Sequence, residues 1–409
     1  MSAQTQHPLL VNSRKYYLDW LRVIAFASLI FYHIGMLYSE TWGFHFKSNY
    51  TSQYVEYLML VFSPWRMLLI WFISGVALRF MIDKVRSFKS WLHFTLYRSI
   101  FLLLPLLVGL WLIVPLQLFA EMSQQGVIDI SYWQFYLAFI ETNNTLFINY
   151  QSGVWPNVDV NHLWYLRSLW QFMLIIIVLT LFARLPFIAP LKTFVKGGMS
   201  FGFLITLLTI ATLFTSYYLT GDSIRETNGL ILLLAGYILA KKTYFWNCLN
   251  KNLVLLALSF AVLFVLIILS YQKVFTLPHF ILSASYNIQR VVGVFFVLAF
   301  AHRFLNFNTY YLKQLNVWVF PFYLLHQSIL IILCFLLQPL SLGPVAEPFI
   351  IITGTWSFCG VITWGITRID VLRPLLGVAI KRDYSPTVKI LGYTAALILI
   401  TPLAYKLIT

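Results

Sequence analysis

The feature that most constrains this chain is a series of long apolar runs. A helix needs about 20 apolar residues to cross the hydrocarbon core of a bilayer, and within that core every backbone polar group must be bonded inside the segment. Each run is therefore expected to be a helix. The sequence predicts an all-α polytopic membrane protein with about 11 transmembrane helices, at residues 16–38, 64–82, 96–120, 163–183, 199–219, 227–240, 252–271, 286–305, 314–338, 348–367 and 388–408.

The composition excludes a soluble fold. Hydrophobic residues make up 60% of the 409 residues and charged residues 10%, whereas soluble domains carry about 25% charged residues. The net charge of +15 has no polar face on which to gather, so we expect no nucleic-acid partner. The three cysteines lack a C-x-x-C or Cys/His pattern, so the sequence predicts neither a disulfide framework nor a metal site.

The excess of positive charge orients the helices, because Lys and Arg beside membrane spans are retained on the cytoplasmic side. With the N-terminus cytoplasmic, eighteen of these residues flank the spans inside and four lie outside. This orientation predicts a cytoplasmic N-terminal tail at 1–15 and a membrane domain at 16–385 with an outer loop at 121–161. An additional C-terminal transmembrane helix is expected at 386–409.

The first span carries two ionisable side chains in one register. A charge within a span costs about 2.5–3.5 kcal/mol on translocon scales, so such residues indicate function. Arg22 and His33 are eleven residues apart, which places them on one helix face roughly 16 Å apart along the axis. This spacing favours a long ligand with an anionic head at Arg22 and a reacting end at His33. The alternative is that Arg22 extends to the interface and His33 is a hydrogen-bonded core residue.

Acyl-coenzyme A fits such a site, because its phosphates suit arginine. Further cations are expected near the cytoplasmic level of Arg22, where they would form an anion-binding vestibule. The residues predicted to bind the coenzyme are Arg22, Arg98, Arg79 and His93.

A second group of polar side chains is expected toward the outer side. At about 1.5 Å per residue, His326 rises within its span to about the depth of His33. The two histidines are therefore the catalytic candidates. The residues predicted to bind substrate in the same half of the bilayer are Arg66, His162, Trp164, Arg167, Arg290 and Gln327.

Four local motifs occur in one order along the chain. They are Leu-Asp-x-x-Arg followed after ten residues by His at 18–33, Arg-Met followed by Phe-Ile-Ser-Gly at 66–75, His-Leu-Trp-Tyr-Leu at 162–166, and Phe-Tyr-Leu-Leu-His-Gln at 322–327. Through these motifs the chain resembles the acyltransferase 3 family of integral-membrane acyltransferases. Within that family it is most similar to the branch of the osmoregulated periplasmic glucan succinyltransferase (glucan biosynthesis protein C). The resemblance extends over residues 14–380.

The resemblance implies a ten-helix core with the N-terminus inside, in the bacterial inner membrane. It also implies an acyl donor taken from the cytosol and a sugar acceptor outside. The family's catalytic histidine corresponds to His33 and its partner arginine to Arg22. The family often has Arg-x-x-Arg at the start of the third helix; here Arg98 matches the first position, but Phe101 occupies the second. The last span lies beyond the ten-helix core, so the resemblance implies no role for it.

The expected reaction moves a succinyl or acetyl group from acyl-CoA, a co-substrate, to a hydroxyl of a cell-envelope glycan. His33 would act as general base, and His326, Gln327 or an arginine would stabilise the oxyanion. No tightly bound cofactor and no metal are expected; the partners are acyl-CoA, the glycan and the lipid bilayer. The alternative is a secondary transporter or exporter with the same residues as a polar path, although the inverted repeats common in transporters are not found.

Overall fold

Helices are the regular elements of the computed structural model, which describes residues 15–141, 144–150, 160–183, 200–381, 384–395 and 397. No strand occurs in those residues. The α-helices are α1 (Tyr16–Tyr38), α2 (Gln53–Leu60), α3 (Arg66–Ile82), α4 (Phe88–Val108), α5 (Val114–Gln124), α6 (Tyr132–Ile140), α7 (Trp164–Phe182), α9 (Phe201–Tyr218), α10 (Asp222–Leu239), α11 (Thr243–Lys251), α12 (Leu253–Tyr271), α13 (His279–Phe304), α14 (Leu312–Leu337) and α15 (Gly343–Arg368).

The short helical turns that matter for the site are a π-helical turn, η1 (Gly109–Ile113), and two 3-10 turns, η3 (Asn161–Leu163) and η6 (Asp370–Leu376). The π turn joins α4 to α5 without a break. Pro115 comes two residues after it and lacks the N–H that would continue the helix ladder. Ser328 of α14 donates to the carbonyl of Ile113 over 2.7 Å, so a neighbouring helix bonds the backbone at this irregular point.

The all-α polytopic membrane fold is confirmed. Within the described part of the chain, eight helices are long and apolar enough to cross a membrane, and α10 with α11, bent by 107°, makes a ninth if the pair is one span. Two other predicted spans are not among these nine. One is α3, which has 17 residues. The other, 388–408, lies mostly outside the described residues, with 386–395 helical. The cytoplasmic position of the N-terminus and the domain boundaries stay predictions.

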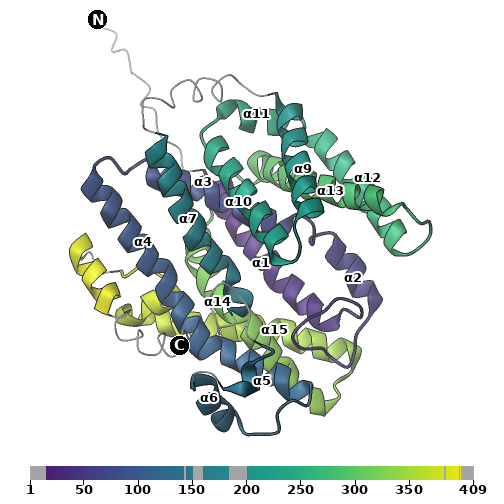
Figure 1. The fold of residues 1–409 in the computed structure, drawn as a ribbon, viewed down its shortest axis with the longest axis vertical. Helices are drawn as coiled ribbons and strands as arrows, with labels where there is room; N and C mark the ends of the chain where they lie inside the picture. The colour runs from purple at the N-terminus through teal and green to yellow at the C-terminus, as the bar shows by residue number, and fades with distance from the viewer. Residues whose placement is uncertain are drawn as a thin grey trace, which may run out of the picture.

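The first helix occupies the middle of the bundle, as Figure 1 shows, and packs against α3, α13, α14 and α15. Its buried face includes Leu21, Ala25 and Leu29, which recur every four residues. Apolar side chains at this spacing form one helix face. Because α1 is central, Arg22 and His33 meet other helices rather than lipid alone.

Glycines bring α3 and α10 into backbone contact. A Cβ on Gly75 of α3 would overlap the carbonyl oxygen of Leu233, and a Cβ on Gly236 of α10 would overlap the carbonyl oxygen of Phe72. Small residues allow such close approach between membrane helices, where packing rather than hydrophobicity drives association. This contact fixes α3, and with it Ser74, relative to the rest of the bundle.

We therefore expect Gly75→Ala and Gly236→Ala to destabilise the protein, because the obstructing atoms are backbone and cannot turn aside. Overpacking of this kind costs about 1–3 kcal/mol. Thermal unfolding of the detergent-purified protein measures the loss. Gly202→Ala on α9 is the matched control, since a Cβ there meets nothing within 4 Å. Equal unfolding temperatures for Gly75→Ala and Gly202→Ala would contradict tight packing at this contact.

Candidate functional site

Two cavities lined by the predicted site residues open along α1. The larger, about 420 Å³, is lined by Arg22 of α1 and Arg98 of α4, and we call it the arginine cavity. The smaller, about 240 Å³, is lined by His33 of α1, and we call it the histidine pocket. No residue lines both of them in the described part of the chain. One helix therefore serves two separate compartments.

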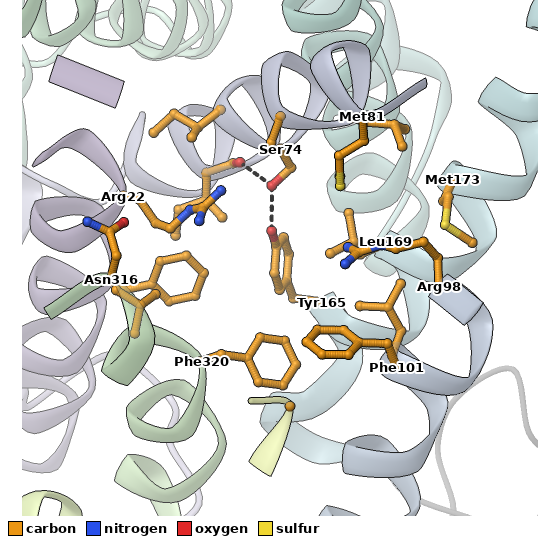
Figure 2. A pocket seen from close by; sticks show the side chains of 18 of the residues that line it. Arg22, Ser74, Met81, Arg98, Phe101, Tyr165, Leu169, Met173, Asn316 and Phe320 are labelled. Atoms are coloured by element: carbon orange, nitrogen blue, oxygen red, sulfur yellow. Dashed lines mark hydrogen bonds between the residues drawn. The ribbon is translucent and has the colours of Figure 1, made fainter. Parts of the chain in front are cut away.

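The arginine cavity has the character of an anion site. Figure 2 shows Arg22 and Arg98 on either side of Tyr165. Among the described residues no Asp or Glu lines the cavity, and the buried Nε of Arg98 has no hydrogen-bond partner. Guanidinium groups bind phosphate and carboxylate well, and a buried charge without a partner is costly. The cavity is thus suited to a ligand that brings negative charge.

Tyr165 and Ser74, which both line the arginine cavity, are hydrogen-bonded to each other. Ser74 donates its hydroxyl proton to the carbonyl of Ile70 over 2.8 Å. Its oxygen then accepts from the hydroxyl of Tyr165, which lies 2.6 Å away (Figure 2). Tyr165 also packs on Trp71, with ring centroids 4.6 Å apart. The hydrogen bond to Ser74 and the ring contact hold Tyr165 in place.

The histidine pocket is built on a pair of imidazoles from α1 and α14. Nδ1 of His33 lies 2.8 Å from Nε2 of His326. Nδ1 of His326 lies 2.8 Å from the carbonyl oxygen of Tyr323 and 3.1 Å from that of Phe322. A carbonyl oxygen accepts and never donates, so Nδ1 of His326 carries a proton. In the neutral ring its Nε2 is then an acceptor.

This bonding pattern assigns the tautomer of His33. Because Nε2 of His326 accepts, Nδ1 of His33 donates, and the lone pair of His33 is left on Nε2. The orientation of the ring is also set by its neighbours, since its plane is nearly parallel to those of His326 and Phe44, whose centroids lie 5.1 and 6.1 Å away. His326 is fully buried. The pair presents one oriented imidazole base, with the second imidazole as its support.

Residues 39–52 form a roof over this pair. Phe44, the ring stacked on His33, belongs to the roof, and its neighbour His45 bonds to Glu121 of α5 over 2.9 Å. Lys47 donates to the carbonyl of Met36, over 2.8 Å, at the end of α1. A cation there also interacts favourably with the helix dipole. These contacts attach the roof to α1 and α5.

The roof has a second attachment at Glu56 of α2. The Thr41 backbone N–H and hydroxyl both donate to this carboxylate, over 2.5 and 2.9 Å, as does Tyr271 of α12, over 2.5 Å. Burial raises the pKa of Glu56, but the hydrogen bonds from Tyr271 and Thr41 outweigh burial and lower the pKa overall. Glu56 is therefore an anion at neutral pH that receives three donors.

The walls of the histidine pocket pair each arginine with an acid. Arg167 donates to Glu226 over 2.9 Å, and Arg225 lies 3.2 Å from Asp222. Arg225 also covers the face of Trp164, with its Cζ 3.8 Å from the ring centroid. The arginine charges are matched, so these walls offer hydrogen bonds and an aromatic face rather than net charge. That chemistry suits a hydroxylated, uncharged ligand.

His162 and Gln327 also line the pocket, and their polar atoms are partly committed. Nε2 of His162 donates to the carbonyl of Leu324 over 3.0 Å, and its Nδ1 lies 3.5 Å from the side-chain nitrogen of Gln117. Gln327 donates to Asn161 over 3.0 Å. Since both nitrogens of His162 are engaged, this residue supports the pocket wall and is poorly placed to exchange protons.

The structure does not bring every predicted residue to the two cavities. Arg79 pairs with Asp83 four residues on, at 3.4 Å, and His93 is stacked on Tyr97. Neither lines the arginine cavity within the described residues. Their assignment to coenzyme binding stays a prediction, and Arg22 and Arg98 are the two members of that set that share a cavity.

Two predicted outer arginines also lie apart from the histidine pocket. The buried guanidinium of Arg66 lies over the ring of Tyr32, with Cζ 3.1 Å from its centroid. Among the described residues its Nε and Nη1 have no hydrogen-bond partner. Arg290 donates to Asn287 over 2.9 Å and lines a separate hollow of about 260 Å³. Substrate contact by either residue stays a prediction.

Sequence reasoning missed residues that meet only in three dimensions. Glu226 and Arg225 lie at the start of α10, ahead of the predicted sixth span, and Phe44 and His45 lie in a connecting segment. In the sequence, Arg225 and Glu226 are recognisable only as charged residues directly before a predicted span. Their position beside the pocket depends on the packing of α10 against α7. Asn161 directly precedes the predicted His-Leu-Trp-Tyr-Leu motif. No group of three or more His, Cys, Asp or Glu in the described residues is arranged to hold a metal.

Comparison with known proteins assigns the family. No curated protein and no solved structure matches the chain. The family model of the acyltransferase 3 domain (Acyl_transf_3, acyltransferase domain) matches residues 15–365. The match runs from the start of α1 almost to the end of α15, and it includes every lining residue of both cavities except Gly377, Val378 and Ala379. The chain belongs to the acyltransferase 3 family and is a multi-pass membrane acyltransferase.

Proposed function

We propose that the protein moves a succinyl or acetyl group from cytosolic acyl-CoA to a hydroxyl of a periplasmic or other cell-envelope glycan, across the bacterial inner membrane. The observation that carries the proposal is the arrangement along α1. An oriented imidazole base lies at His33, and Arg22 lines a cavity in which Arg98 is a second guanidinium group. The sequence resemblance to the glucan succinyltransferase branch supports the choice of acceptor.

In the proposed complex the arginine cavity receives the anionic part of the donor. Phosphate oxygens would accept from Arg22 and Arg98, and the pantetheine arm would extend along α1 toward His33. Eleven residues of helix separate Arg22 from His33, or about 16 Å. An extended arm is suited to that distance, whereas a compact anion is not.

The acceptor hydroxyl lies in the histidine pocket, where its proton passes to Nε2 of His33. The hydroxyl oxygen bonds to the thioester carbonyl carbon, and the C–S bond then breaks. The coenzyme leaves as a thiolate and takes the proton from the His33 imidazolium, so the products are an ester and the coenzyme thiol. His326 accepts from Nδ1 of His33 throughout, so it orients the base and stabilises the imidazolium. Because both nitrogens of His326 are occupied, Gln327 is the better placed donor to the oxyanion.

The reaction is tested with purified protein in nanodiscs, with succinyl-CoA or acetyl-CoA as donor and a periplasmic glucan fraction as acceptor. We expect thiol release that depends on added glucan, and mass spectrometry should show glucan that has gained an acyl group. A rate of thiol release that is the same with and without glucan would contradict a glycan acceptor. In a parallel assay with the protein in sealed proteoliposomes, movement of an acyl group into the lumen without a new ester would instead support the exporter alternative.

Loss of either histidine should slow catalysis without loss of donor binding. We expect His33→Ala to lower kcat by about 10²–10⁴-fold, the range for a general base. His326→Ala should cause a comparable loss, because Nδ1 of His33 no longer has its acceptor. The double variant should be no worse than the poorer single variant, since the pair acts as a unit.

The control for the histidine variants is His302→Ala. This residue lies on α13, where it bonds to Asn250, and it lines neither cavity in the described structure. Its kcat should match the parent protein. A His326→Ala protein with undiminished kcat would show that the imidazole pair is not what orients the base.

Arginine variants should act on donor binding. Hydrogen bonds to charged groups contribute about 1.5–3 kcal/mol, so Arg22→Gln and Arg98→Gln should each weaken binding of succinyl-CoA roughly 10- to 100-fold. Isothermal titration with a non-hydrolysable thioether analogue measures Kd directly. Arg303→Gln changes an exposed arginine at the end of α13 and should leave Kd unchanged. If Arg22→Gln and Arg303→Gln bind alike, the arginine cavity is not the donor site.

A further inference from the structure

The separation of the two cavities requires a movement during the proposed reaction. The donor binds in the arginine cavity, yet its thioester must reach His33, which lines the histidine pocket. Within the residues that the structure describes, the two cavities have no common lining residue. Some side chain between them must therefore move before transfer, provided that the proposed function holds.

Three packed aromatic rings lie between the arginine cavity and the imidazoles of His162 and His326. Phe26, Tyr165 and Tyr323 lie edge to face, with centroids 6.1 Å apart for Phe26 and Tyr165, and 5.6 Å for each of the other two pairs. Phe26 and Tyr165 line the arginine cavity. Tyr323 lies against both His162 and His326 on the other side, at 6.2 and 6.3 Å. The three rings form a partition between the donor and the base.

Two rings of the partition are fixed by hydrogen bonds. The hydroxyl of Tyr165 donates to Ser74, and that of Tyr323 donates to the carbonyl of His162 over 2.8 Å. Turning either ring would leave buried polar groups without their hydrogen bonds. Phe26 has no polar side-chain atom and loses no hydrogen bond when it turns. Phe26 is the ring of the three that moves at the lowest cost, because an unmade buried hydrogen bond is expensive.

The position of Phe26 on α1 also suits a gate. It lies four residues after Arg22 and seven before His33, spacings that place all three side chains on about the same helix face. A donor arm that follows this face from the arginine toward the histidine meets Phe26 on the way.

Beside Phe26 is a space that can receive its ring. A slot of about 240 Å³ lies between α1, α14 and α15, with walls that include Phe26, Ala27, Trp318, Phe322, Trp356 and Gly360. The slot is larger than the roughly 150 Å³ of an apolar cavity that holds benzene. Aliphatic and aromatic walls would gain dispersion contacts from a phenyl ring. Phe26 borders both the arginine cavity and the slot.

We propose that Phe26 is the gate between the two cavities, and that its ring turns into the slot to let the donor thioester reach His33. With the ring in the slot, the space that it leaves joins the arginine cavity to the base. With the ring in place, the partition keeps water of the histidine pocket away from an incoming thioester. Phe26 thus positions the donor and limits hydrolysis, and it takes no part in bond making.

Filling the slot tests the gate. A Cβ at Gly360 meets only Phe322 and Trp318, at 3.9 and 4.0 Å, which is ordinary contact, so Gly360→Leu should fold and occupy the space that Phe26 needs. We expect kcat for acetyl transfer from acetyl-CoA to fall about tenfold or more, with Kd for acetyl-CoA within about threefold of the parent. Gly365→Leu, on the same helix with nothing near its Cβ, is the matched control and should retain full kcat.

Removal of the Phe26 ring should increase hydrolysis of the donor, whereas filling the slot should slow transfer. In Phe26→Ala the partition is open, so water reaches the thioester at His33. We expect thiol release from acetyl-CoA without added glucan to rise about tenfold or more over the parent. The release should disappear in the Phe26→Ala, His33→Ala double variant. That dependence separates gated hydrolysis by the base from non-specific damage.

The outcomes distinguish the gate from the reaction on which it rests. If the parent protein transfers acetyl groups and Gly360→Leu matches Gly365→Leu, the gate proposal is overturned while the proposed function stands. If Gly360→Leu slows octanoyl transfer but not acetyl transfer, the slot holds the acyl chain and the gate is likewise overturned. If the parent protein releases no thiol from succinyl-CoA, acetyl-CoA or octanoyl-CoA in the presence of glucan, the proposed function fails and the gate falls with it.

Discussion

The hydrogen bond between His33 and His326 is the interaction on which the rest of the site depends. It joins residues 293 positions apart and lies deep among packed helices, where an unpaired imidazole nitrogen would be costly. The carbonyls of α14 fix the proton of His326, which in turn fixes the proton of His33 and leaves one lone pair for chemistry. In serine hydrolases a buried carboxylate orients the histidine base; in the mechanism that we propose for this protein, a second, neutral imidazole has that place.

Much of this arrangement can be predicted from the local sequence. Arg22 and His33 share one face because they are eleven residues apart on a helix that the apolar residues around them require. Arg98 is expected near Arg22 because it lies deep in an apolar run of the same cytoplasmic half. Arg79 pairs with Asp83 one turn later. The i, i+4 spacing of these two residues is visible in the sequence and predicts this ion pair, while coenzyme contact by Arg79 stays a prediction.

Other parts of the site were beyond sequence reasoning, because they depend on how distant segments meet. Helical rise places His326 at the depth of His33, but rise alone does not decide whether the two rings face each other. The pairing of Arg167 with Glu226 depends on contact between α7 and α10. The roof over His33 depends on single hydrogen bonds from a connecting segment with no periodic pattern. Such contacts change the charge of the pocket from net positive to balanced, and under the proposed function a balanced pocket would suit a neutral sugar better than an anionic acceptor.

In this mechanism α1 sets the distance between donor and base, with an anion held at one end and an acyl group delivered at the other. The most direct measurement is an experimental structure of the protein with coenzyme A bound in a lipid nanodisc. We expect phosphates beside Arg22 and Arg98, with the pantetheine arm and its sulfur directed along α1 toward His33. Coenzyme A bound elsewhere, or Arg22 and His33 facing lipid without a shared path, would contradict this mechanism.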